Sequence, residues 1–154
     1  MVEILTTEEM DRDGKKNQIC IGGKSSHAVG HQKDLIEHKA RFFSLRDASN
    51  DTHATLKLDE KGNVGEIKGK QNAPVSKKYD PYILDFLEVS PFIQSVSAGP
   101  IATGIYTHNR RYYSYRRLPS GLTFDDLDLS LTEGVILPET MYVDKKLCLN
   151  GNSP

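Results

Sequence analysis

The sequence predicts an α+β fold, a three-stranded antiparallel meander with a packed helix, followed by a short β-rich, repeat-like C-terminal tail. Three observations carry this prediction. Strand-like runs separated by turns occupy residues 41–69, a helix-start signal follows at Asp80-Pro81, and a leucine-proline pattern recurs from residue 118 onward. That order is typical of neighbouring strands that pair in sequence and are then covered by a helix.

The chain has 154 residues, which is enough for one ordinary hydrophobic core and a small appendage. Residues 1–17 are polar enough to form either a short edge element or a partly disordered arm. We therefore expect a polar N-terminal arm, an α+β domain, a connector and a repeat-like tail, at residues 1–17, 18–92, 93–117 and 118–154.

The charges are balanced, with 20 basic and 21 acidic residues and a net charge of −1. Any binding to nucleic acid or membrane must therefore come from a local patch. No apolar run approaches the roughly 18 residues of a membrane span, and the N-terminus lacks the apolar core of a secretory signal. We expect a cytoplasmic protein with no membrane contact and no cofactor, in which the distant Cys20 and Cys148 are free thiols.

The predicted strands differ in how they bury their side chains. Phe42 and Phe43 are adjacent, which suits a strand buried on both faces. Residues 53–58 alternate between polar and apolar, which is the period-two pattern of a half-buried strand. In the third run, Gly65 predicts a bulge. The strands are expected at residues 41–47, 53–58 and 64–69, after a short exposed helix at residues 30–39.

The predicted packed helix spans residues 80–89. Asp80 can accept hydrogen bonds from the free amides at a helix start, and Pro81 suits the first helical position. Ser90-Pro91 ends the pattern. The apolar side chains expected to cover one face of the sheet are Ile83, Leu84, Leu87 and Phe86.

The tail contains two copies of one pattern. Leu118-Pro119 and Leu137-Pro138 are nineteen positions apart, and each pair precedes a leucine-x-leucine run, with one extra residue in the second copy. The pattern is similar to the LPxGL…LxLS units of leucine-rich-like repeats of bacteria and phages. That resemblance implies one short strand per coil. Because about three coils are needed for an independent solenoid, we expect either that this tail leans on the preceding domain or that the chain is shortened relative to longer relatives.

Four short blocks in the first half of the chain resemble, in the same order, the signature blocks of PcfJ-like proteins. They are Cys20-Ile21-Gly22-Gly23, Ser44-Leu45-Arg46-Asp47, His53-Ala54-Thr55-Leu56 and Ile67-Lys68-Gly69-Lys70-Gln71-Asn72. The resemblance covers about residues 18–88 and implies a protein of bacterial mobile elements or phages. Ile19 stands where the family usually has a histidine.

The same blocks supply candidate binding residues at strand ends and in loops. Arginine can bind phosphate or carboxylate with two parallel hydrogen bonds, and asparagine can read base edges. The alternative is structural, in which Arg46 and Asp47 pair with surface groups and Asn72 stabilises its own turn. The candidates are Arg46, Lys68, Lys70 and Asn72.

A catalytic interpretation centres on Cys20. His27 could act as its base and Asp47 or Asp51 could orient the imidazole, because a thiol needs a base or a positive field to react at neutral pH. The alternative is that Cys20 is a small buried apolar residue beside a glycine turn.

Four histidines could in principle supply a metal site, and two of them lie four residues apart. No acid completes a zincin motif, and Gly30 interrupts the helix that would present the pair. The sequence therefore predicts no metal and four solvated imidazoles, those of His27, His31, His38 and His53.

The segment 106–117 concentrates arginine and tyrosine. Arginine contacts phosphates and tyrosine rings stack on bases, which suits single-stranded nucleic acid. The same residue types are enriched at protein-binding hot spots, and a plain strand with solvated arginines is the third possibility. The candidate binding residues are Arg110, Arg111, Tyr112, Tyr113, Tyr115, Arg116 and Arg117.

Together these features predict a small protein of a phage or mobile element that acts by binding a macromolecule. We expect a bacterial protein or ribonucleoprotein complex as its partner, and an inhibitor of a host defence such as CRISPR is a plausible role by analogy. Two alternatives stay open: an accessory protein that binds single-stranded RNA or DNA, and a Cys20-dependent enzyme. The sequence leaves the oligomeric state open.

Overall fold

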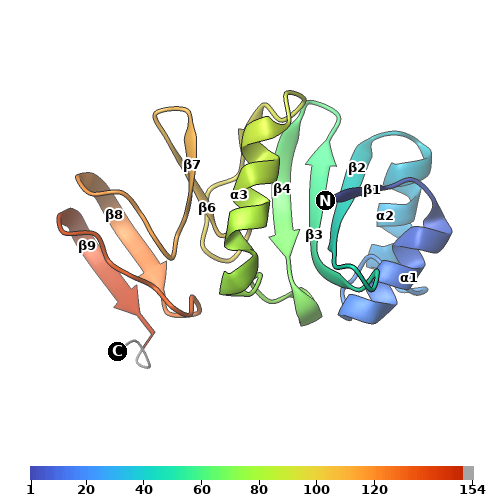
Figure 1. The fold of residues 1–154 in the computed structure, drawn as a ribbon, viewed down its shortest axis with the longest axis horizontal. Coiled ribbons are helices and arrows are strands. Elements are labelled where there is room, and N and C mark those ends of the chain that lie inside the picture. The colour runs from blue at the N-terminus through green and yellow to red at the C-terminus, as the bar shows by residue number, and fades with distance from the viewer. Residues whose placement is uncertain (151–154) are drawn as a thin grey trace.

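The computed structural model describes residues 1–150 and arranges them as a five-stranded sheet followed by two smaller two-stranded sheets (Figure 1). The strands are β1 Val2–Ile4, β2 Ala40–Arg46, β3 Thr52–Asp59, β4 Asn63–Lys68, β5 Ser95–Val96, β6 Ile105–His108, β7 Arg111–Ser114, β8 Leu122–Leu129 and β9 Met141–Leu149. The helices are α1 Thr7–Asn17, α2 Ser26–Ile36 and α3 Asp80–Val89, with short 3-10 turns at Lys70–Asn72 and Lys77–Tyr79.

The large sheet has the order β1-β2-β3-β4-β5. Its first four strands pair antiparallel, and β5 joins β4 in parallel. The predicted meander is therefore present as the centre of the sheet. The bulge is also confirmed, because Lys57 pairs with Glu66 while Leu58 pairs with Val64, which leaves Gly65 as the extra residue.

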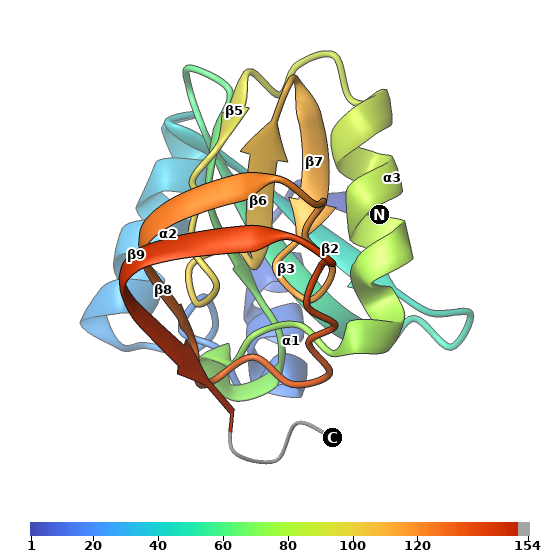
Figure 2. The ribbon, with the colours of Figure 1, turned by 90° about the vertical axis from the view of Figure 1, so that its left-hand side faces the viewer.

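The two faces of the sheet are covered by different helices. Phe43 points into a core shared with Ile83 and Leu87 of α3, whereas Phe42 points into a second core with Met10 of α1. Successive residues of a strand face opposite sides, so the adjacent phenylalanines serve both cores. Figure 2 shows α3 apart from α1 and α2 across the sheet.

The N-terminal segment is ordered, which corrects the expectation of a partly disordered arm. Residues 2–4 form an edge strand, which agrees with the other alternative, a short edge element. The helix α1 that follows was not predicted. Thr6 Oγ1 accepts from Glu9 N at 3.2 Å, and Glu9 Oε2 accepts from Leu5 N at 2.9 Å. This reciprocal capping fixes the start of the helix. The second helix, α2, begins at Ser26 instead of residue 30, since Ser25 Oγ caps Ala28 N.

The helix α3 has the predicted bounds but not the predicted cap. Tyr79 is the cap residue and makes no side-chain cap bond. Asp80 directs its carboxylate away from the helix amides, toward Arg116 and Ser114. The expectation that Asp80 caps the helix is therefore wrong, and its carboxylate instead joins α3 to the segment after β7.

In the tail, β8 and β9 pair in parallel. Leu122 pairs with Met141 at an offset of nineteen, and Leu127 pairs with Leu147 at an offset of twenty after an irregularity near Asp126. The extra residue of the second copy is accommodated at this irregularity. Adjacent coils of a solenoid would pair in the same way. That the tail belongs to the leucine-rich-like repeats stays a prediction.

The tail leans on the rest of the molecule through a third apolar core. Its members come from β8 and from the segment that follows β7, with Tyr106 of β6 packed against them. The buried residues are Tyr115, Leu118, Leu122, Leu127 and Leu129. Across residues 1–150, no helix is both long and apolar enough to cross a lipid bilayer.

Candidate functional site

The arginine-tyrosine segment forms the hairpin β6–β7 and the turn after it. Its two-residue loop, Asn109-Arg110, has positive φ at both positions, as a tight hairpin between twisted strands requires. The arginines at and beside the hairpin, Arg110, Arg111 and Arg117, are exposed, and Tyr112 and Tyr113 are half-buried. These five residues stay candidates for binding.

Two members of the segment lie inside the molecule, which corrects the expectation that they bind a partner. Tyr115 is 6% exposed and packs edge-on against Tyr106, with ring centroids 5.7 Å apart. Burial raises the pKa of Tyr115 to about 12. Arg116 is 9% exposed. Neither side chain is available to a macromolecule at the surface.

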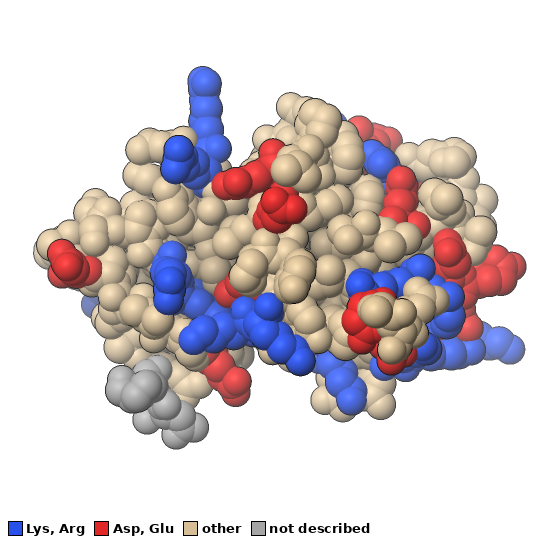
Figure 3. All heavy atoms as spheres, in the orientation of Figure 1, with Lys and Arg blue, Asp and Glu red and all other residues tan. Residues whose placement is uncertain are grey.

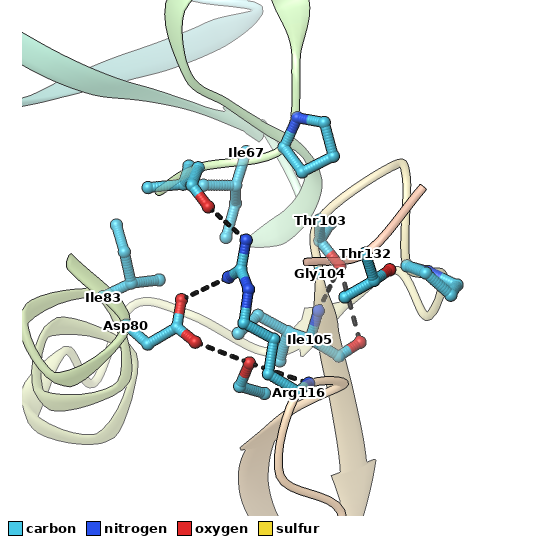
Figure 4. Close-up of a pocket in the computed structure, with 12 residues that line it drawn as sticks. Ile67, Asp80, Ile83, Thr103, Gly104, Ile105, Arg116 and Thr132 are labelled. Atoms are coloured by element: carbon cyan, nitrogen blue, oxygen red, sulfur yellow. Dashed lines mark hydrogen bonds and ion pairs between the residues drawn. The ribbon is translucent and has the colours of Figure 1, made fainter. Parts of the chain in front are cut away.

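Arg116 is held by internal partners on several sides (Figure 4). Its Nη1 lies 2.8 Å from Asp80 Oδ1, its Nη2 donates to Val75 O at 2.6 Å, and its Nε donates to Glu133 O at 2.8 Å. The cavity beside it measures about 20 Å³, enough for about one water molecule. The cluster is therefore a structural junction between α3, the loop before it and the tail.

Arg46 is likewise a structural residue. Its guanidinium donates two hydrogen bonds to Asp13 Oδ2, at 3.1 and 2.8 Å, and the Asp13 side chain is fully buried. The Arg46 guanidinium is therefore engaged inside the protein and is not free for a ligand. The alternative expectation, that Arg46 and Asp47 pair with surface groups, holds for Asp47, which contacts His53, but the partner of Arg46 is buried. The partner comes from α1, a helix that the sequence reasoning did not expect.

The proposed catalytic triad is not assembled. Cys20 Sγ lies 3.7 Å from Nε2 of His31, not of His27. Asp47 Oδ2 lies instead 2.8 Å from His53 Nε2, a contact that lowers the pKa of Asp47 together with backbone amides of its own turn. His27 and Asp47 are therefore not partners of Cys20. Within the described residues, no three histidine, cysteine or acidic side chains gather as a metal site would require.

The remaining family-block candidates separate into two places. Lys68 and Asn72 lie beside Cys20 in one small pocket, where Asn72 Oδ1 accepts from Cys20 N at 3.5 Å. Lys68 Nζ also donates to Ile101 O at 2.6 Å. Lys70 points into a different and much larger hollow.

That hollow is a groove of about 800 Å³ where several parts of the chain meet. Its walls are the end of α1, the start of β3, the loop between β4 and α3, and the loop after β8. Figure 3 shows that Lys and Arg side chains gather around and below the lower end of α3. We call it the basic groove, and its polar and charged lining includes Lys16, Asn17, His53, Lys70, Lys77, Lys78, Tyr79, Arg116 and Glu133.

The lysines of the basic groove are largely free. Lys16 is paired with Asp51 at 2.6 Å. Among residues 1–150, no ion pair joins Lys70, Lys77 or Lys78 to an acidic side chain. The loop 70–78 therefore presents three uncompensated ammonium groups to the groove, in a protein whose overall charge is nearly zero.

One wall of the basic groove is aromatic. The rings of Tyr79 and His53 are stacked, with centroids 4.7 Å apart and planes 20° apart. Lys78 Nζ lies 5.0 Å from the centroid of the Tyr79 ring. Such a wall offers a flat, polarisable surface next to positive charge.

A buried amide also lines the basic groove. Asn17 is 3% exposed, and within the described residues its Nδ2 has no hydrogen-bond partner. Leaving such a donor unpaired costs about 1–3 kcal/mol, so a ligand atom that accepts from it recovers this free energy. The groove thus combines positive charge, an aromatic wall and a donor in need of an acceptor.

Of the residues that line this groove, the sequence analysis named Lys70 and Arg116 as binding candidates. The run Lys77-Lys78-Tyr79 was a local signal, since it places two positive charges directly before an aromatic ring. Asn17 and His53 gave no such signal, because their role depends on parts of the chain that lie more than twenty residues away in sequence. Comparison of the chain with protein-family models, curated proteins and solved structures found no significant match. The PcfJ-like resemblance therefore stays a prediction.

Proposed function

We propose that the protein binds single-stranded nucleic acid in the basic groove. The observation that carries this proposal is the meeting of three unpaired lysines, Lys70, Lys77 and Lys78, with the stacked Tyr79 and His53 rings in one hollow. Lysines attract phosphates, and aromatic faces stack on bases. Base faces are free for stacking only in an unpaired strand, which favours single-stranded over double-stranded ligands.

The size of the basic groove supports this proposal. About 800 Å³ is within the range of ordinary ligand sites, whereas the cavity beside Arg116 holds little more than one water. Asn17 Nδ2 would donate to a phosphate or base oxygen. Arg110 and Arg111 at the tip of the β6–β7 hairpin do not line the basic groove and would add non-specific attraction at most. Arg117 differs from them, because it lines a neighbouring hollow together with Lys77.

The test is fluorescence anisotropy with a labelled single strand of mixed sequence. A variant with Lys70, Lys77 and Lys78 changed to alanine should lose most of the binding. The matched control changes Arg110, Arg111 and the exposed Lys24 to alanine, which removes the same charge away from the groove, and should bind nearly as the unaltered protein does. Equal losses in the two variants would show general charge attraction and not a site.

A second candidate function is the binding of a bacterial protein at the open edge of β9. Leu129 of β8 is 0% exposed, whereas Leu149, its partner in β9, is 43% exposed. In the part of the chain that the structure describes, β9 pairs only with β8. A partner strand with leucines at alternate positions would pair with the free edge and cover these side chains. By pairing with such a strand, β9 would occupy a surface of the expected partner, a bacterial protein or ribonucleoprotein complex, and so inhibit it.

For this second candidate, a partner captured from a bacterial lysate is purified and titrated against the protein. Changing Leu147 and Leu149 to serine should abolish that binding and leave nucleic-acid binding unchanged. A partner that binds the serine variant equally well would remove the β9 edge from consideration.

A further inference from the structure

A small pocket on the α1–α2 side of the sheet gathers polar groups that the proposed function does not use. It measures about 20 Å³, and apolar walls from Ile19, Ile21 and Phe42 enclose it. Its polar and charged lining comprises Cys20, His31, Thr55, Lys57, Glu66, Lys68 and Asn72. The space admits a water-sized molecule and little more.

One hydroxyl at this pocket has no partner. Thr55 is 5% exposed, and within residues 1–150 its Oγ1 makes no hydrogen bond. A buried hydroxyl is normally satisfied by protein or by an ordered small molecule. The pocket is therefore suited to a small ligand that can accept or donate a hydrogen bond.

The contacts of His31 fix the position of its proton. Lys57 Nζ lies 3.3 Å from Nδ1 of His31 and 3.0 Å from Asp34 Oδ2. An ammonium group only donates, so Nδ1 must accept, and the ring proton of neutral His31 must then sit on Nε2. Burial, and then the Lys57 charge, lower the pKa of His31, while Glu66 and Asp34 act in the opposite sense and His27 in the same sense.

This tautomer decides what His31 can do for Cys20. The Nε2–H points to a sulfur 3.7 Å away, so His31 donates to Cys20 and cannot take its proton. The hydrogen bond that His31 donates orients the sulfur within the pocket, which Lys57, Lys68 and the oppositely charged Glu66 also line. Asn72 Oδ1 accepts from the Cys20 amide and holds the residue in place.

We propose that Cys20 is a reactive thiol that small peroxides oxidise in this pocket. The thiolate sulfur attacks one peroxide oxygen, so that an S–O bond forms and the O–O bond breaks. The sulfur loses two electrons, and the leaving hydroxide takes a proton to become water. The thiol proton goes to solvent, and the net reaction converts thiol and hydrogen peroxide into sulfenic acid and water. Thr55 Oγ1, which lines the same pocket, would donate to the departing oxygen.

The experiment uses the full chain, in which Cys148 is an internal control. The protein is treated with hydrogen peroxide at pH 7, sulfenic acid is trapped with dimedone, and peptide mass spectrometry gives the rate at each cysteine. Cys20 should react at least about tenfold faster than Cys148, and this difference should vanish in urea. Equal rates in the folded protein would overturn the proposal.

Two variants separate a built site from mere exposure. His31→Leu removes the donor and should lower the Cys20 rate about tenfold, whereas His31→Gln, which keeps an amide donor, should restore part of it. Thr55→Val keeps the shape and removes the hydroxyl. It should slow peroxide oxidation of Cys20 but leave alkylation by iodoacetamide unchanged, since that reaction releases iodide and no oxygen. If none of these variants changes the Cys20 rate, the pocket plays no part in its reactivity.

Discussion

The guanidinium of Arg116 lies 2.8 Å from the carboxylate of Asp80, and this largely buried ion pair joins the C-terminal tail to α3. Asp80 also accepts a hydrogen bond from Ser114 Oγ at 2.8 Å. Arg116 and Asp80 are thirty-six positions apart in sequence. The loops on either side of this junction form walls of the basic groove, and Arg116 itself lies in the lining, so the ion pair fixes one side of the site.

Changing Arg116 to methionine should therefore destabilise the whole protein. The change leaves the Asp80 carboxylate and two carbonyl oxygens without their partner, which costs about 3 kcal/mol in the free energy of unfolding. Urea denaturation followed by circular dichroism measures this loss. The neighbouring exposed Arg117 is the control, and its change to alanine should stay within about 0.5 kcal/mol. Similar effects at both positions would contradict the assigned junction.

The tail should be most sensitive in its inner strand. Leu129→Ala empties a fully buried position and should lower the free energy of unfolding by about 2–5 kcal/mol. Leu149→Ala, at the paired but half-exposed position of β9, should cost less than about 1 kcal/mol. Urea titrations of the two variants make the comparison. A larger loss at Leu149 would mean that β9 is covered by a partner in solution.

Tyr115 should make stability fall at high pH. Its folded pKa of about 12 is above the ordinary 10.0, so the neutral phenol is favoured in the folded state. This contribution is fully present below pH 10 and is lost as the pH rises toward 12. Over that range, the free energy of unfolding should fall by on the order of 2 kcal/mol more in the unaltered protein than in Tyr115→Phe. If the free energy of unfolding depends on pH in the same way in both proteins, the phenol of Tyr115 is not desolvated.

Tyr79 should contribute stacking to nucleic-acid binding. Tyr79→Leu removes the aromatic face and should weaken binding of a single strand by about 1–3 kcal/mol, whereas Tyr79→Phe should bind almost normally. The matched control is Tyr82→Leu, because Tyr82 is exposed on α3 and does not line the groove. Anisotropy titrations with one labelled strand compare all three variants. A loss at Tyr82 equal to that at Tyr79 would argue against a stacked base.

Local patterns predicted the parts of the fold that depend on nearby residues. The adjacent phenylalanines, the glycine bulge and the helix 80–89 all follow from spacing and turn chemistry. The extra residue in the second tail copy likewise appears in the β8–β9 register. The helix α1 was missed although its Thr6-x-x-Glu9 capping pattern is in the sequence.

The site was less predictable because its residues are distant in sequence. Residue type alone could not show which arginine of the segment 106–117 lies inside, since that depends on Asp80 and on the carbonyls of Val75 and Glu133. Arg46 was likewise assigned to a ligand because its partner, Asp13, belongs to a helix that was not foreseen. The basic groove exists only after folding brings its walls together.

The salt dependence of single-strand binding tests the central claim most directly. Each phosphate contact contributes a slope of about −0.7 to the plot of log affinity against log salt concentration. Changing Lys70, Lys77 and Lys78 to alanine should therefore make the slope shallower by about 2, while the variant with Arg110, Arg111 and Lys24 changed to alanine should nearly keep the original slope. An unaltered protein that binds no single strand at low salt, or a lysine variant with an unchanged slope, would contradict the claim that the basic groove holds the nucleic acid.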